Sequence, residues 1–276
     1  MNSVAYDSNE NYRFLKRLLR DEFGAAMSED QEQKVTDKLD AVMTEHNIGS
    51  LQSLYEQLRK TDTSALRTEV LHAITEYNIN WFSYPEITSV FVNYVLPNLA
   101  QNSDKPYRVW VVGCGRGQAA YSLAIAADRY KKKEERDLPI EIIATDTSKK
   151  AVVDAKKATF RASFLYGLDE ADRSQYMTFE NEEWVVNDSI KSMVSFSVAN
   201  PFYLDDENPG EIDLIIAPDI LAYYTVLAKS QVLELFANCL VDAGMLIVGN
   251  HEPVQPFCEQ FSLVDHSSGV FYRKQK

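Results

Sequence analysis

The sequence predicts an α/β protein: a doubly wound, mostly parallel sheet that follows a helical N-terminal region. Up to about residue 96, apolar residues recur at helical spacing and little suggests strands. From Tyr107 onward, short apolar runs alternate with helical segments, the pattern of a parallel sheet with helices on both faces. Three glycines at alternate positions, 113, 115 and 117, follow the first of these runs. Together these observations place a tight turn between the first strand and its helix.

The N-terminal region is expected to form five helices. Several begin at residues that favour helix N-caps, namely Ser28, Ser50 and Ser64. The predicted helices span residues 11–23, 28–46, 50–60, 64–76 and 87–96. A polar stretch, 98–106, ends in a proline and is expected to be a linker. The chain is therefore divided into a helical domain, 1–97 with a linker to about 106, and an α/β domain, 107–276.

Five central strands and a closing hairpin are expected in the second domain. The strands span 107–113, 141–146, 193–198, 213–217 and 245–249. A helix is expected at 118–130, and the strongest helix between the strands is 228–241. The segments 261–264 and 270–273 are expected to pair across a short turn. An insertion at about 160–192 interrupts the alternation with two short strands, 176–179 and 183–186. Exposed strands of such a piece can receive an added peptide strand.

The glycine-rich turn predicts a nucleoside-cofactor site. Glycines let the backbone pass closely beneath a ligand, and the helix that follows offers free amide donors there. A dinucleotide fingerprint would need glycine at position 118, which is Gln118, so the spacing favours S-adenosylmethionine (SAM) over NAD. A tight turn without a ligand is the alternative for the glycines alone. Asp146 favours the cofactor, because a carboxylate at the end of the next strand can accept both hydroxyls of a ribose.

Charge and cysteine content exclude several classes of protein. The formal net charge of -13 argues against nonspecific binding of nucleic acid, because a negative surface repels phosphate. The three cysteines are odd in number and lack metal or redox spacing, so neither a disulfide framework nor a metal site is expected. No opening segment has the regions of a signal peptide and no apolar run approaches membrane-spanning length. We expect a cytoplasmic protein without membrane insertion.

One basic helix face is the exception to the acidic balance. Within residues 11–23, the cations Arg13, Lys16, Arg17 and Arg20 recur at helical spacing opposite an apolar stripe. This face could dock an acidic partner. An ordinary solvated helix face is the alternative explanation.

The motifs and their order resemble the chemoreceptor glutamate O-methyltransferases of bacterial chemotaxis, the CheR type. Residues 114–122 are similar to the family's C-S-T-G-E-E-P-Y-S loop, and 144–148 to its A-T-D-I-S ribose motif. Residues 194–200 resemble the adenine segment V-x-F-x-x-x-N-L, with Pro201 where leucine is usual, and 244–252 resemble the strand motif G-x-L-x-x-G-x-S-E. The resemblance covers about residues 11–273. It implies a small helical N-terminal domain and a Rossmann-like SAM-dependent methyltransferase domain with an inserted antiparallel β-subdomain.

The resemblance also implies roles for individual residues. Tyr223 and Trp81 would frame the transferring methyl group, and Asp219 would border the same catalytic pocket. The glycine turn and Gln118 would hold the methionine part of SAM, Asp146 the ribose, and Asn200 the adenine. The full set of expected SAM-binding residues is Gly113, Cys114, Gly115, Gly117, Gln118, Asp146, Thr147, Asn200, Pro201 and Ala217.

Several pocket positions depart from the family's pattern. Ser83 stands where the motif T-x-F-F-R-E has arginine, and Pro218 and Asp219 replace the arginine and asparagine of C-R-N-V-x-I-Y-F. Gln118 replaces a glutamate that would pair with the ammonium of SAM, which weakens binding by about 1 kcal/mol or somewhat more. Asp219 would repel a carboxylate acceptor unless Arg116 or His251 neutralises it.

Two functional hypotheses follow. In the first, the chain methylates a glutamate carboxylate of a chemoreceptor-like protein, which needs no general base because the acceptor is already ionised near neutral pH. The basic face of residues 11–23 would then contact the receptor. In the second, the chain keeps the fold as a SAM-binding regulatory or scaffold protein without turnover, which would explain the losses around the acceptor pocket.

Overall fold

The computed structural model describes most of the chain, but parts of the N-terminal region and three short segments near the C-terminal half lie outside the description. The described residues are 13, 16–18, 32–59, 66, 70, 80–102, 105–201, 209–221, 224–249 and 252–275. The chain divides into two compact units, one of residues 1–76 with 222–229, the other of 77–221 with 230–276. No helix among the described residues is long and apolar enough to cross a membrane.

The first unit is helical, as predicted. It contains α2 (Glu32–Glu45) and α3 (Leu51–Leu58), and the hydroxyl of Ser50 caps α3 by accepting the N–H of Ser53 at 3.1 Å. Of the predicted basic helix, Arg13, Lys16 and Arg17 are helical and exposed, whereas Arg20, Ser28 and Ser64 lie outside the described residues. The core of this unit is apolar: Leu18, Leu39, Met43, Ile48, Leu54, Leu58, Leu66 and Val70.

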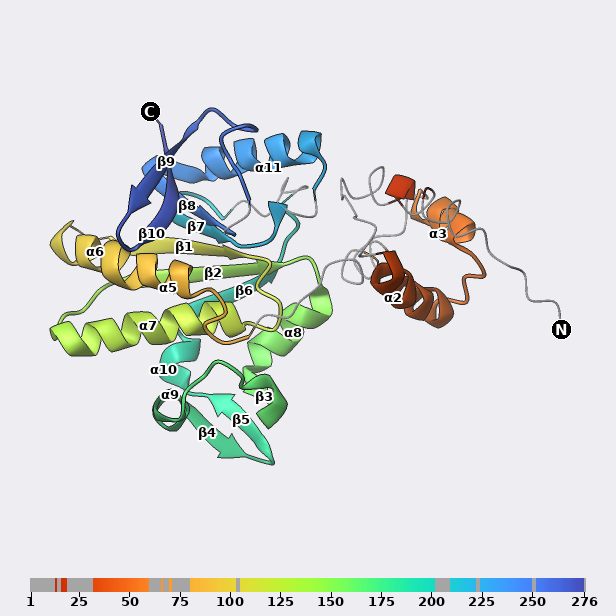
Figure 1. Ribbon diagram of the computed structural model, residues 1–276. Coiled ribbons are helices and arrows are strands. Elements are labelled where there is room, and N and C mark those ends of the chain that lie inside the picture. Colours follow the sequence, from red (N-terminus) through yellow and green to blue (C-terminus); the bar gives the residue numbers. More distant parts are fainter. Residues whose placement is uncertain are drawn as a thin grey trace. The chain divides into compact units, whose positions relative to one another are not determined.

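The second unit is built on a seven-stranded sheet in the order β6-β2-β1-β7-β8-β10-β9 (Figure 1). The pairs from β6 to β8 are parallel, and β10 is antiparallel to both of its neighbours. The strands are β1 (Tyr107–Val112), β2 (Ile140–Asp146), β6 (Val194–Val198), β7 (Ile212–Ala217), β8 (Leu240–Val248), β9 (Phe261–His266) and β10 (Gly269–Lys274). The doubly wound fold is confirmed. Because the strand order reverses at β1, the carboxyl ends of β1, β2 and β7 form the edge where such folds bind ligands.

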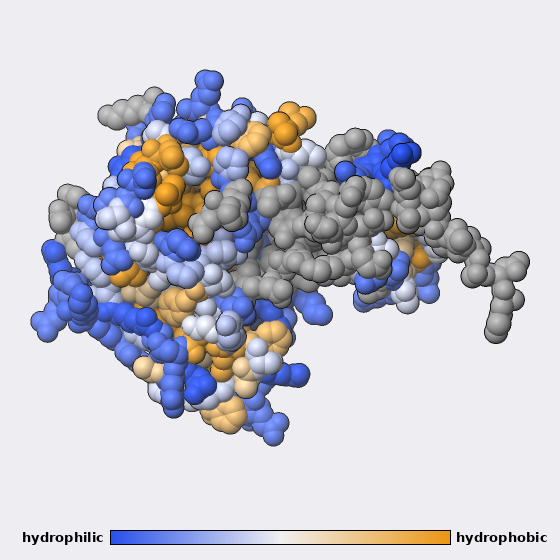
Figure 2. All heavy atoms as spheres, viewed as in Figure 1, coloured by the Kyte–Doolittle hydropathy of each residue, from blue (hydrophilic) through white to orange (hydrophobic). Residues whose placement is uncertain are grey.

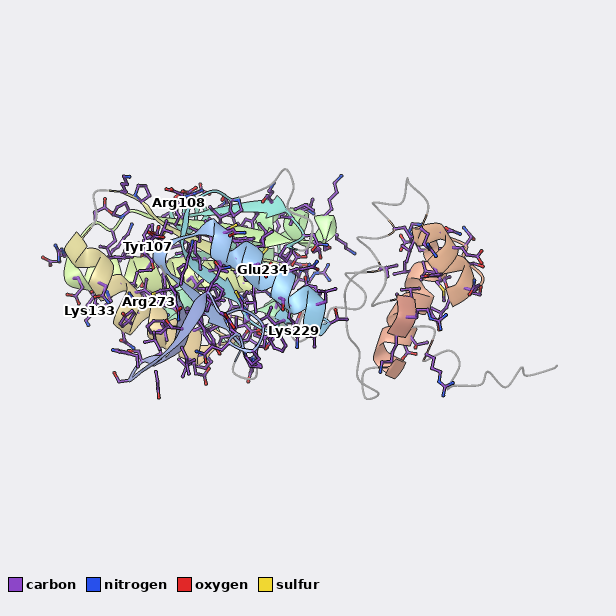
Figure 3. All side chains as sticks on the ribbon, turned by 90° about the horizontal axis from the view of Figure 1, so that it is seen from above. Tyr107, Arg108, Lys133, Lys229, Glu234 and Arg273 are labelled. Atoms are coloured by element: carbon purple, nitrogen blue, oxygen red, sulfur yellow. The ribbon has the colours of Figure 1, made fainter. Side chains whose placement is uncertain are left out.

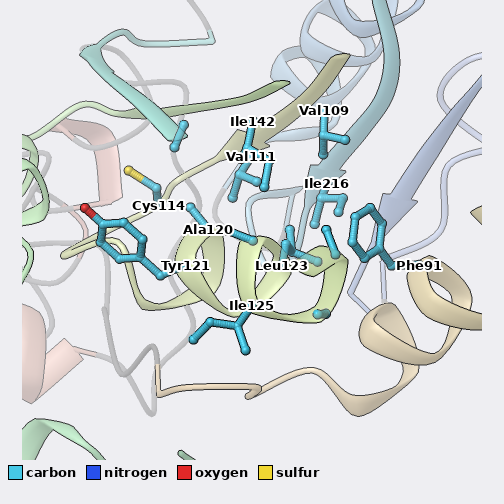
Figure 4. Packing of buried hydrophobic residues seen from close by; sticks show 14 of the residues in the cluster. Phe91, Val109, Val111, Cys114, Ala120, Tyr121, Leu123, Ile125, Ile142 and Ile216 are labelled. Carbon is cyan, nitrogen blue, oxygen red and sulfur yellow. The ribbon is translucent and has the colours of Figure 1, made fainter. Parts of the chain in front are cut away.

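Alternate residues of β1 bury opposite faces of the sheet. Val109 and Val111 join a core with α7 (Gln118–Glu134), as Figure 4 shows for the residues that it labels. Trp110 faces the other way and packs edge-to-face on Phe236 of α11 (Val226–Cys239), with ring centroids 5.5 Å apart. Figure 1 accordingly shows α7 and α11 on opposite sides of the sheet. The sheet is therefore buried on both faces, which explains its nearly continuous apolar strands.

The helical run before β1 belongs to the sheet unit. It consists of α5 (Pro85–Val90), a π-helical turn η2 (Phe91–Val95) and α6 (Leu96–Asn102). Its residues Val90, Phe91, Val95 and Leu96 are at most 2% exposed and share the core of β1 and α7. The structure therefore groups residues 77–106 with the sheet, whereas the sequence analysis placed them in the helical domain and a linker.

The insertion forms a small antiparallel sheet, as predicted, with one unforeseen strand. Its order is β3-β5-β4, from β3 (Thr159–Phe160), β4 (Met177–Glu180) and β5 (Glu183–Val186). Short helices flank it: η3 (Ala162–Phe164), α9 (Glu170–Tyr176) and α10 (Asp188–Lys191). An ion pair between Arg129 of α7 and the buried carboxylate of Asp172 in α9 fixes this β-subdomain to the main sheet's helix layer.

The surface of the face shown in Figure 2 is mostly hydrophilic, with separate hydrophobic areas over the C-terminal strands and toward the β-subdomain. The described residues include several exposed large apolar side chains in these regions of the chain. Tyr166 is 76% exposed and Phe179 59%, while Leu263 and Val270 of the C-terminal hairpin are 47% and 51% exposed. Separate apolar residues of this kind are normal on a folded domain.

Candidate cofactor and acceptor site

The turn after β1 requires its glycines for both conformation and space. Gly113, Gly115 and Gly117 have φ of 70°, 53° and 94°, the left-handed region that side chains disfavour. A Cβ on Gly113 would lie 2.5 Å from Cδ1 of Ile220, and one on Gly117 would lie 3.0 Å from the ring of Tyr121. Gly117 also precedes α7, so the turn opens on the helix N-terminus as predicted.

The carboxylate of Asp146 holds this turn in place. Its Oδ2 accepts the N–H of Gly115 at 2.8 Å, and its Oδ1 accepts the N–H of Ser148 at 2.8 Å. Asp146 is 1% exposed, and the N–H of Cys114 donates to the carbonyl of Thr145 at 2.9 Å. The loop is thus attached to the end of β2 through two hydrogen bonds, from the N–H groups of Gly115 and Cys114, and the N–H of Ser148 holds the Asp146 carboxylate itself. The sequence predicted that Asp146 binds the ribose but did not indicate that it also binds the loop. The ribose contact stays a prediction.

The residues after β2 include a hydroxyl that suits a ligand. The Oγ1 of Thr147 is buried and accepts or donates no hydrogen bond among the described residues. A buried hydroxyl without a partner costs free energy, so a polar ligand group at this position would stabilise the site. Ser148 begins α8 (Lys149–Lys157), and its hydroxyl accepts the N–H of Ala151 at 3.1 Å. The unpaired hydroxyl of Thr147 supports its prediction as a cofactor residue.

The other predicted cofactor residues come from the ends of neighbouring strands. The N–H of Ala199 donates to the carbonyl of Asp146 at 3.0 Å, which places Asn200 and Pro201 just beyond β6 at the end of β2. Ala217 ends β7 and is fully buried. The structure therefore brings the ends of β1, β2, β6 and β7 to one edge, as the fold predicts.

Arg116 differs from its expected use. Its guanidinium pairs with Asp154 of α8 at 3.2 Å and lies over the ring of Phe164, 4.5 Å from the centroid. These contacts fasten the glycine loop to α8 and to the start of the β-subdomain. The sequence analysis suggested Arg116 as a neutraliser of Asp219, and the structure gives it these partners instead. The other suggestion, His251, lies outside the described residues.

Trp81 is a core residue in this structure. It is 1% exposed, its Nε1 donates to the carbonyl of Phe164 at 3.0 Å, and its ring packs edge-to-face on Phe160 at 5.1 Å. A Cβ on Gly167 would come within 2.0 Å of the Trp81 carbonyl oxygen, so the two segments touch through their backbones. These contacts give Trp81 a structural role. Its predicted partner beside the methyl group, Tyr223, lies outside the described residues.

The predicted acceptor side lies at the end of β7, where the structure joins two segments that are far apart in the sequence. The hydroxyl of Tyr84 donates to Oδ2 of Asp219 at 3.0 Å. The N–H groups of Asp219 and Gly249 both donate to Oε2 of Glu252 at 2.8 Å, and Glu252 is 6% exposed. The strand motif contained Glu252, but no spacing in the sequence indicated that Tyr84 would reach Asp219.

The surroundings of the Cys114 thiol in the glycine loop disfavour its reactive thiolate form. Burial raises the pKa of the Cys114 thiol well above its ordinary value, and the nearby carboxylate of Asp146 raises it further. Cys114 is 0% exposed and belongs to the core of the sheet unit, and its predicted contact with SAM stays a prediction. No group of three or more His, Cys, Asp or Glu side chains in the described part of the chain could hold a metal ion.

Comparisons with known proteins identify the family. A family model described as CheR methyltransferase, SAM binding domain, matches residues 79–270. "Chemotaxis protein methyltransferase 1" of Pseudomonas aeruginosa is 26% identical over 272 residues, covering 96% of this chain and 98% of that protein. "Chemotaxis protein methyltransferase Cher2" of Pseudomonas putida is 24% identical, with 96% and 98% covered. A Vibrio cholerae protein that is also named "Chemotaxis protein methyltransferase 1" is 26% identical, covering 96% of this chain and 97% of that protein.

Among solved structures, a TehB-like SAM-dependent methyltransferase from Corynebacterium glutamicum is similar at 11% identity, covering 68% of this chain and 87% of that one, with a TM-score of 0.40. The assignment rests on the family model, which spans the sheet and the β-subdomain. The glycine turn, the orphaned hydroxyl of Thr147 and the strand order fit SAM as the cofactor. The chain belongs to the CheR methyltransferase family, and it is a SAM-dependent methyltransferase.

Proposed function

We propose that the chain transfers a methyl group from SAM to a glutamate carboxylate of a chemoreceptor-like protein. The observation that carries the proposal is the glycine turn held by Asp146 at the switch point of the sheet, with the end of β7 beside it. The names of its relatives, chemotaxis protein methyltransferases, support the choice of acceptor. The acceptor itself is an inference from these relatives.

SAM, when bound, supplies a methyl group on a sulfonium, which is a strong electrophile. The acceptor oxygen would take this methyl group, and the electron pair of the broken S–CH₃ bond would stay on sulfur. No proton moves, because a glutamate carboxylate is already ionised near neutral pH. The chain's residues therefore need only to bind both partners, hold them in line and exclude water.

Five groups of the chain would hold the cofactor. The free amides at the start of α7 would receive the methionine carboxylate, and the neutral side chain of Gln118, 4% exposed, would meet the ammonium. Asp146, which already binds the loop, would accept the ribose hydroxyls. Thr147 and Asn200 would complete the polar contacts.

The receptor would meet two surfaces outside the pocket. The exposed cations Arg13, Lys16 and Arg17, with Arg20 of the same predicted helix, would face its acidic surface. The strand β4 pairs only with β5 within its three-stranded sheet, so an extended peptide could add to its free edge. Both contacts are proposals that follow from charge and from strand pairing.

Calorimetry and labelled methyl transfer test the proposal together. We expect SAM and its demethylated product to bind, and receptor fragments to acquire label that alkali releases as methanol, because a methyl ester is base-labile and an N-methyl group is not. A fragment with each candidate Glu→Gln change is the matched control and should lose the label. Binding without transfer would favour the SAM-binding regulatory protein, and alkali-stable label would identify another acceptor.

A further inference from the structure

A short turn before α5 is attached to the cofactor helix. The hydroxyl of Ser83 accepts the N–H of Asn80 at 2.7 Å and donates to its carbonyl at 2.5 Å, which closes the turn. The N–H of Phe82 donates to Oγ of Ser122 at 3.0 Å, and that hydroxyl donates to the carbonyl of Gln118 at 2.7 Å. The turn is therefore positioned by the first turn of α7, which follows the glycine loop.

The next residue, Tyr84, is directed toward the end of β7. Its ring packs against the core of the sheet unit, and Pro85 after it disfavours a helical backbone at Tyr84, which has φ of -119° and ψ of 81°. Its hydroxyl donates to Oδ2 of Asp219 at 3.0 Å. Because the ring is packed and the backbone is restricted, the Tyr84 hydroxyl is held in one position, from which it donates to Asp219.

The main chain of Asp219 is also held in place by a hydrogen bond. It has a φ of 59°, and its N–H donates to the buried carboxylate of Glu252. A Cβ on Gly249 would lie 2.5 Å from Oδ1 of Asp219, so this second oxygen rests over a glycine that has no room for a side chain. Both oxygens of Asp219 thus have defined positions, although the residue is exposed.

The location of Asp219 matters for the acceptor. The side chain of the next residue, Ile220, packs directly against Gly113, the first glycine of the cofactor loop. Asp219 therefore stands beside the cofactor turn, at the carboxyl end of β7 where the methyl acceptor must approach. In the family's motifs, the positions of Tyr84 and Asp219 carry glutamate and asparagine, so the two exchanges fall on residues that contact each other.

We propose that Asp219 is a specificity-determining residue for the methyl acceptor and that Tyr84 is its positioning residue. A fixed anion beside the acceptor oxygen disfavours an acceptor flanked by further carboxylates. It favours an acceptor glutamate with a neighbouring lysine or arginine, whose cation neutralises Asp219 as the carboxylate enters. This inference rests on the proposed function for its acceptor, and it deepens that function by naming the charge of the flanking sequence.

The test compares two peptides that differ only beside the acceptor glutamate, one with lysine and one with glutamate at the flanking position. Binding is measured in the presence of S-adenosylhomocysteine, which prevents turnover, and kcat/KM is measured with SAM. We expect the full chain to prefer the lysine-flanked peptide by about two- to five-fold, the effect of one partly screened charge pair. Asp219→Asn should bring the ratio to about one without changing the affinity for S-adenosylhomocysteine.

Two further variants separate specificity from folding. Tyr84→Phe should reduce the preference in part and add nothing in the Asp219→Asn background, because it acts only through that carboxylate. Asp242→Asn, which removes an exposed carboxylate from the amino-terminal part of β8, should leave the ratio unchanged. An equal preference in the unaltered chain and in Asp219→Asn, or no binding of either peptide, overturns this inference. A charge preference in binding without methyl transfer would overturn the proposed function and support the inference.

Discussion

The cofactor side and the acceptor side of the site are built in different ways. On the cofactor side, the left-handed glycines and the carboxylate of Asp146 act on the main chain of the loop. On the acceptor side, the Tyr84–Asp219 hydrogen bond joins two side chains that are 135 residues apart. A side-chain pair can exchange both members and still form a contact, and Tyr84 and Asp219 both depart from the family's motifs while contacting each other.

The largest effect is expected from removing the carboxylate that holds the loop. Asp146→Ala deletes two hydrogen bonds to a charged acceptor, which together contribute about 3 kcal/mol or more. We expect the affinity for SAM to fall at least about 100-fold and the melting temperature to fall as well. Asp154→Ala is the control, since Asp154 meets the same loop only through the exposed side chain of Arg116. It should change the SAM affinity by less than about three-fold. Equal losses in both variants would remove the special role of Asp146.

A glycine pair tests the backbone requirement next. Gly117→Ala forces a Cβ into a left-handed conformation and to within 3.0 Å of Tyr121, so unfolding should become easier by about 2–4 kcal/mol. Gly49→Ala is the matched control, because nothing lies within 4 Å of a Cβ there and it should stay within about 0.5 kcal/mol. Urea denaturation of the full chain measures both. A tolerated Gly117→Ala would show that the turn can adopt another conformation.

A variant of Gln118 tests whether the cofactor site lacks a negative charge beside the ammonium of SAM. Gln118→Glu restores an anion beside the expected ammonium of SAM, and the affinity should rise by up to about ten-fold. Without ligand, the same variant should melt at a lower temperature, because Gln118 is 4% exposed and a buried carboxylate without a cation is costly. Gln175→Glu, on the exposed face of α9, should produce neither change. A variant that melts lower and gains no affinity would place the ammonium elsewhere.

Trp81 separates a structural role from a catalytic one. Trp81→Phe keeps an aromatic ring but removes the N–H that donates to the carbonyl of Phe164, a loss of about 1–2 kcal/mol of stability. Because the ring is buried against Phe160, we expect the SAM affinity and kcat to change by less than about two-fold. A large fall in kcat with unchanged stability would restore Trp81 to the methyl-transfer site.

The parts of the fold that could be predicted are those with local causes. The glycine turn, the strands β1, β2, β4, β5, β6 and β7 and the N-cap at Ser50 follow from backbone conformation, apolar runs and capping chemistry near in sequence. The boundary at residues 97–107 could not, because the helices of 85–102 are apolar toward the sheet and nothing local shows which core they join. The pairing of Arg116 with Asp154 was hidden for the same reason.

The candidate site shows the same division. The cofactor residues were named from the loop, whereas the hydrogen bonds of Asp146 to the loop and of Tyr84 to Asp219 depend on how distant segments meet. A signal for Tyr84 existed in principle: positions 84 and 219 both depart from the family's motifs. Two departures indicate a contact only when the fold is known to bring them together.

The smallest effect is expected at the opposite edge of the sheet, near the amino ends of β1 and β7. There Asp213 accepts the N–H of Arg108 at 2.8 Å, and Figure 3 labels Arg108 and the preceding residue Tyr107. Burial raises the pKa of the Asp213 carboxyl above its ordinary value. Folding therefore favours the protonated form, so this group costs stability above its folded pKa and the cost disappears as the pH falls through that value.

Asp213→Asn should accordingly stabilise the chain near neutral pH, by less than about 1 kcal/mol because the group is only half-buried. The advantage should shrink as the pH falls and vanish where the aspartate is protonated, which melting temperatures across pH 4–8 can follow. SAM affinity should not change, since the residue lies at the other end of β7 from Ala217. A gain that persists at low pH would point to packing instead of charge. A change in affinity would show that the two edges of the sheet are coupled and that the cofactor side does not depend on its own backbone alone.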